Sequence, residues 1–69
     1  MSDDRATKLF ELDDQITRLQ SELQDLSERA AAAKGPASEE RLNDMIAETE
    51  AKLAAFRETR AAAGAAPQA

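Results

Sequence analysis

The stretch from Leu9 to Ala33, LFELDDQITRLQSELQDLSERAAAA, places an apolar residue at alternating intervals of three and four positions. Read as heptads abcdefg, these residues alternate between positions a and d; in order they are Leu9, Leu12, Ile16, Leu19, Leu23, Leu26, Ala30 and Ala33. This spacing keeps one narrow apolar stripe along a single side of a helix. Such a stripe is typical of a coiled-coil seam, so the stretch predicts a helix that packs against one other helix.

The dipeptide Gly35-Pro36 interrupts this helix. Glycine permits the left-handed backbone that often closes a helix, and proline cannot donate the next helical hydrogen bond. A second helix can then begin in two ways. Ser38 can act as an N-cap in front of acidic residues, or Pro36 can be the first helical residue.

The cap at Ser38 defines one domain, a single helical hairpin that occupies residues 1–69. Its predicted parts are a first helix over about residues 3–33, a turn over 34–38, a second helix over about 39–62 and a flexible tail over 63–69.

A weaker apolar stripe runs along the second half of the chain, at Leu42, Ile46, Thr49, Leu53 and Phe56. If the chain doubles back around Pro36, facing residues have numbers that sum to about 72, and every a residue faces a d residue, as antiparallel packing requires. The sequence therefore predicts an all-α fold, an antiparallel two-helix hairpin of the coiled-coil type. Its predicted helix–helix seam consists of Ile16, Leu19, Leu23, Leu26, Leu42, Ile46, Leu53 and Phe56.

The same register predicts a weakness at the open end of the hairpin. There it places Leu12 opposite Arg60 and Leu9 opposite Ala63, so both leucines are poorly covered, and Phe10 falls outside the seam at position b. A phenylalanine beside two half-covered leucines is the kind of cluster that anchors an interface. We therefore expect Leu9, Phe10 and Leu12 to form a docking site for a partner; the alternative is that they are ordinary exposed apolar residues.

Residue types that carry most catalysis and metal binding are missing. The chain has no His, Cys, Trp or Tyr, and only two glycines. The common general base, the thiolate nucleophile, the usual zinc ligands and a glycine-rich phosphate loop are thus absent. Neighbouring acids such as Asp13 and Asp14 diverge by about 100° on a helix and do not converge on one ion. We expect no enzyme activity, cofactor, metal site or small-molecule substrate.

The charge balance restricts the partners. Fourteen acidic and nine basic residues give a net charge of −5, which argues against nucleic acid and anionic membrane surfaces. No apolar run approaches the roughly 20 residues that span a bilayer, and the acidic start lacks the features of a secretory signal. We expect no transmembrane segment or membrane insertion, no signal peptide, and a location in the cytoplasm or in a soluble assembly.

A chain of 69 residues is below the size at which one core comfortably stabilises a fold. Packing in an oligomer or against a larger assembly would bury the apolar surface that a two-helix hairpin leaves partly exposed. We therefore expect a non-catalytic helical-hairpin interaction module, a small accessory or structural subunit that docks onto a larger protein assembly through its apolar stripe. The alternative is a free homodimeric four-helix bundle that acts as an adaptor or regulator.

Overall fold

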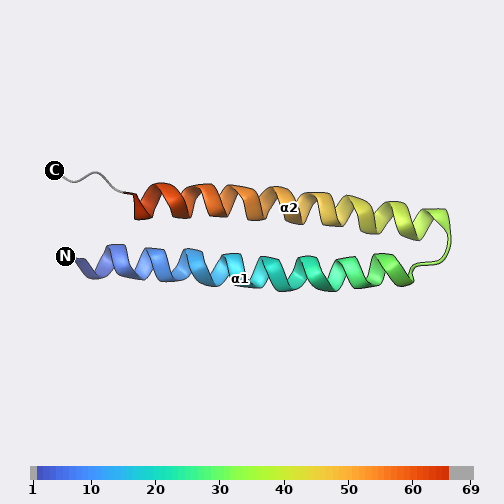
Figure 1. Cartoon of the computed structure of the whole chain (residues 1–69), viewed down its shortest axis with the longest axis horizontal. Helices are drawn as coiled ribbons and strands as arrows, with labels where there is room; N and C mark the ends of the chain where they lie inside the picture. The colour runs from blue at the N-terminus through green and yellow to red at the C-terminus, as the bar shows by residue number, and fades with distance from the viewer. Residues whose placement is uncertain (1, 66–69) are drawn as a thin grey trace.

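The computed structural model describes residues 2–65 and contains two α-helices, α1 (Ser2–Ala32) and α2 (Pro36–Gly64). The helices run antiparallel beside each other, so the beginning of α1 and the end of α2 lie at the same end of the molecule (Figure 1). The predicted all-helical hairpin is therefore confirmed.

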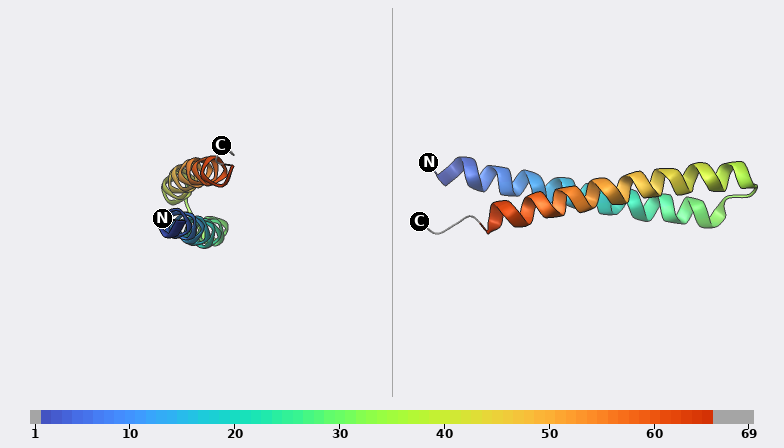
Figure 2. Two further views of the ribbon diagram at one scale, coloured as in Figure 1. Left: turned by 90° about the vertical axis from the view of Figure 1, so that its left-hand side faces the viewer. Right: turned by 90° about the horizontal axis from the view of Figure 1, so that it is seen from above.

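The hairpin is a narrow slab of 55 × 16 × 12 Å. Its helices cross at a shallow angle when the slab is seen from above (Figure 2). This crossing follows from the seam, because a stripe with a period of 3.5 residues stays in contact with its neighbour only if the two helices wind gently around each other.

Local charge pairs support α1 along its exposed side. Arg18 Nε lies 3.1 Å from Asp14 Oδ2, and Arg29 Nε lies 3.1 Å from Asp25 Oδ2. Both pairs have the spacing of four residues, with the acid on the N-terminal side, that stabilises isolated helices by about 0.2–0.5 kcal/mol. Arg29 also lies in the last turn, where a positive charge complements the helix dipole.

The turn is shorter than predicted. It consists of residues 33–35, and α2 begins at Pro36 and not at residue 39. Gly35 has φ 101°, a left-handed conformation that L side chains avoid, and Pro36 follows in the first helical position, where its missing N–H costs nothing. The Glu39 N–H donates to the Gly35 carbonyl at 3.2 Å, so Ser38 lies inside the first turn and is not the cap.

The second helix is also longer than predicted at its other end. It continues to Gly64, and the Ala65 N–H donates to the Ala61 carbonyl at 2.9 Å. Alanine has the highest helix propensity, which explains why the run of alanines at 61–63 extends the helix. The first residues of the predicted flexible tail, 63 and 64, are therefore helical, and residues 66–69 lie outside the described residues.

A single line of contact forms the core. Leu26, Leu53 and Leu19 are buried, with 3%, 5% and 9% of their surface exposed, and Thr49 is buried between them at 4%. The half-buried residues are the other seam positions: Leu9, Leu12, Ile16, Leu23, Ala30, Ala33, Leu42, Ile46, Phe56, Arg60 and Ala63. Every other residue between 4 and 65 is exposed, and no side chain in the described part is less than 2% exposed. The core is thus one residue thick.

Candidate protein-interaction surfaces

The open end of the hairpin is sealed by a polar contact across the seam. Arg60 of α2 takes a seam position, and its Nε donates to Asp13 Oδ1 of α1 at 2.8 Å, while its Nη2 donates to Asp13 Oδ2 at 3.5 Å. The Arg60 side chain is one-third exposed. Its aliphatic part therefore covers a place in the seam where a leucine would otherwise stand, and its guanidinium reaches the solvent edge.

A second arginine ties the ends of the two helices together. Arg5 Nη2 of α1 donates to the backbone carbonyl of Ala63 at 2.9 Å. This carbonyl belongs to the last turn of α2, where carbonyl groups have no partner within the helix. Each helix thus contributes one arginine that holds the open end.

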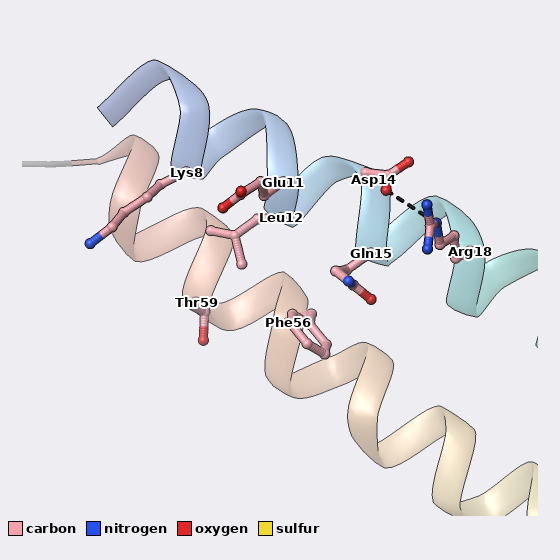
Figure 3. Close-up of a pocket in the computed structure, with 8 residues that line it drawn as sticks. All are labelled: Lys8, Glu11, Leu12, Asp14, Gln15, Arg18, Phe56 and Thr59. Carbon is pink, nitrogen blue, oxygen red and sulfur yellow. Dashed lines mark ion pairs between the residues drawn. The ribbon is translucent and has the colours of Figure 1, made fainter. Parts of the chain in front are cut away.

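Between the helices near this end lies a groove (Figure 3). It measures about 650 Å³ and is lined by Lys8, Glu11, Leu12, Asp14, Gln15, Arg18, Phe56 and Thr59. Leu12 from α1 and Phe56 from α2 form its apolar centre, with Lys8 and Arg18 toward its two ends in Figure 3. Both central residues are half-buried, so part of each apolar side chain remains accessible.

The chemistry of this groove is that of a contact surface. Its one ion pair, between Asp14 and Arg18, links two residues of the same helix, and its other polar groups are an amide, a hydroxyl, an ammonium and a carboxylate. Within residues 2–65 no three acidic side chains gather in a way that could hold a metal ion. The groove can offer apolar contact at its centre and hydrogen bonds at its rim.

The structure does not bring Leu9, Phe10 and Leu12 together as one patch. Leu12 borders the groove, and Leu9 is half-buried in the seam. Phe10 is 74% exposed and does not line the groove. The reason is helical geometry, because residues two apart point about 160° away from each other around the axis. The open end therefore presents apolar surface on two opposite sides.

The predicted seam residues all lie between the helices, four on α1 and four on α2, and each is buried or half-buried. Sequence reasoning placed Arg60 opposite Leu12 but missed its bond to Asp13, the bond from Arg5 to Ala63, and the groove. One signal was present for the first of these: Asp13 directly follows the residue that faces Arg60.

Neither helix in the described part of the chain has a segment long and apolar enough to cross a lipid bilayer. No protein-family model, no curated protein and no solved structure matches this chain.

Proposed function

We propose that this chain is a non-catalytic interaction module, a small accessory or structural subunit that packs its helical hairpin against helices of a larger protein assembly. The observation that carries this proposal is the thin core. Eleven of the fifteen seam residues are only half-buried, so the hairpin covers its own apolar surface incompletely.

Helix packing is the simplest way to complete such a core. A further helix laid along the slab would contact the accessible edges of Leu12 and Phe56 through the groove between α1 and α2. The rim supplies side chains of both charges, Lys8 and Glu11 among them, which fits the polar border of a protein interface. This arrangement favours a protein partner over a small molecule, because the groove runs along an open face.

The residue types agree with a structural role. The chain has no His and no Cys to act as general base, nucleophile or soft metal ligand. The acidic groups of the groove, Glu11 and Asp14, lie three residues apart on α1 together with basic neighbours, and Asp14 is held by Arg18. These pairs are typical of a solvated helix surface.

Site-specific photo-crosslinking in the source cells tests the proposal. A photoreactive amino acid replaces Gln15, which lines the groove, and in a matched control it replaces Ser21, an exposed residue of the same helix outside the groove. We expect a crosslink to one defined protein from position 15 and a much weaker one from position 21. Equal labelling from both positions, or no crosslinked protein while the chain migrates at its own mass, would contradict the proposal.

A further inference from the structure

The slab has two broad faces that differ in charge. The heptad register places positions c and g of both helices on one face and positions b and e on the other. The groove agrees with this division, because five of its lining residues occupy c or g positions, whereas Asp13, which bonds to Arg60, occupies e. We call the c/g side the charged face and the b/e side the neutral face.

On α1 the contrast is plain. The charged face carries six ionised residues, Lys8, Glu11, Arg18, Glu22, Asp25 and Arg29. The neutral face carries five consecutive uncharged residues, Thr17, Gln20, Gln24, Ser27 and Ala31, all exposed. These five cover fourteen residue steps, about 21 Å of helix. Phe10, also on this face, is 74% exposed.

Charges on the charged face find opposite charges within the chain. Asp25 pairs with Arg29 at 3.1 Å, and Arg18 pairs with Asp14 at 3.1 Å from the adjacent edge. On α2, Glu48 stands four residues before Lys52, the spacing that favours such a pair. This face is already neutralised by its own residues.

Two charges on the neutral face lack such neighbours. Glu50 and Arg57 are exposed and form no ion pair within residues 2–65. The residues three and four positions from Glu50 are Ile46, Ala47, Leu53 and Ala54. Those around Arg57 are Leu53, Ala54, Arg60 and Ala61. The nearest acid across the seam, Asp13, is held by Arg60.

Glu50 and Arg57 stand seven residues apart, about 10.5 Å along the same side of α2. Their opposite signs and equal distances from Ala54 make the pair self-complementary. If a second α2 lies antiparallel across a two-fold axis near Ala54, Glu50 of each copy comes beside Arg57 of the other. A symmetric interface therefore makes this ion pair twice.

We propose that the neutral face binds a second copy of this chain, so that two hairpins form a four-helix bundle in which α2 packs antiparallel on α2 and α1 on α1. The proposal rests on the proposed function and names the module's first partner. The dimer is then the unit that presents its charged faces, and the grooves on them, to the larger assembly.

The charge of α2 as a whole fits this arrangement. Its first half, residues 36–50, carries five acids and one base, and its second half, residues 51–64, carries three bases and one acid. Antiparallel packing places each acidic half beside a basic half, whereas parallel packing would oppose like charges. On α1 the same axis brings Phe10 near Ser27 and Gln24 of the copy, where no charge must be buried.

The available area is sufficient. The broad face is 55 × 16 Å, an outline of about 880 Å². Each partner in a stable protein interface contributes about 800 Å². A face of this size can support a dimer when most of its length is in contact.

Charge reversal in the full chain tests the proposal, with molar mass measured by sedimentation equilibrium and helicity by circular dichroism. We expect a dimer for the unmodified chain. Glu50→Arg places like charges together twice and should weaken dimerisation about tenfold or more, as should Arg57→Glu; the double swap should restore it to within about threefold. The control Glu58→Arg, the same change on the outer edge of α2, should leave the dimer intact.

A second measurement does not depend on these charged variants. The chain has no cysteine, so Ala54→Cys introduces a single thiol close to the two-fold axis. Oxidation should link two copies rapidly through this residue and slowly through Ala55→Cys, which lies on the charged face. A monomer at all concentrations, dimerisation unaffected by either single charge reversal, no rescue by the double swap, or faster linkage through position 55 would each overturn the proposal. A monomer that still gives the crosslink at position 15 would discard the dimer and keep the proposed function.

Discussion

The seam is closed differently at its middle and at its open end. In the middle, Leu19, Leu26 and Leu53 exclude water by apolar contact, and each is at most 9% exposed. At the open end the equivalent layer pairs Leu12 with Arg60, and the closure is an ion pair to Asp13 at 2.8 Å. Both regions follow the same heptad register, but they depend on different interactions.

The difference separates stability from binding. Apolar burial near the middle holds the two helices in register, and its removal leaves a cavity or a gap. An exposed ion pair contributes little and can rearrange when another surface approaches. The open end is therefore the part of the hairpin that can receive a partner without loss of the fold, and the groove with Leu12 and Phe56 lies there.

The largest expected effect tests the middle. Leu26→Ala removes the most deeply buried leucine, at 3% exposure, and should lower the free energy of unfolding by about 2–3 kcal/mol. The matched change Leu9→Ala, at a half-buried seam position near the open end, should cost about 1 kcal/mol or less. Urea unfolding followed by circular dichroism, with all variants at one protein concentration, measures both. Equal losses would show that the two regions do not differ in this way.

Much of the fold followed from periodicity. The apolar stripes and the breaker Gly35-Pro36 were enough to predict an antiparallel hairpin, because spacing along a helix determines which residues share a side. The start of α2 could not be decided in the same way. Pro36 and Ser38 each make an acceptable first turn, and the outcome depends on the backbone of Gly35, with φ 101°, which no spacing reports.

The candidate surfaces were predicted less well for a related reason. A heptad register places Cα atoms but does not say where a long side chain ends, so the reach of Arg60 to Asp13 and of Arg5 to the Ala63 carbonyl was not foreseen. Leu9, Phe10 and Leu12 are close in sequence, and the helix turns Phe10 away from the other two. The groove depends on flanking positions of both helices, which the seam pattern does not describe.

The next prediction concerns the polar closure itself. Arg60→Ala removes both the ion pair and the aliphatic cover over the open end, and should lower the free energy of unfolding by about 0.5–1 kcal/mol. Arg60→Leu keeps apolar cover at the same seam position and should recover that loss, because an exposed Asp13 loses little when it is left to water. Urea titrations of the three proteins at matched concentration provide the comparison. If Arg60→Leu were as unstable as Arg60→Ala, the ion pair and not the cover would be the main contribution.

The smallest effect lies at the polar residue of the middle. Thr49 is 4% exposed and takes a seam position otherwise suited to an aliphatic side chain. Thr49→Val replaces the buried hydroxyl with a methyl group of nearly the same shape and should raise the free energy of unfolding by about 0.5 kcal/mol, since no hydroxyl then has to leave water. The same exchange at Thr17, which is exposed on α1, should change stability far less. A rise in the thermal midpoint for Thr49→Val alone would confirm that the middle is governed by apolar burial, whereas a fall would show that the Thr49 hydroxyl makes a contact the seam depends on.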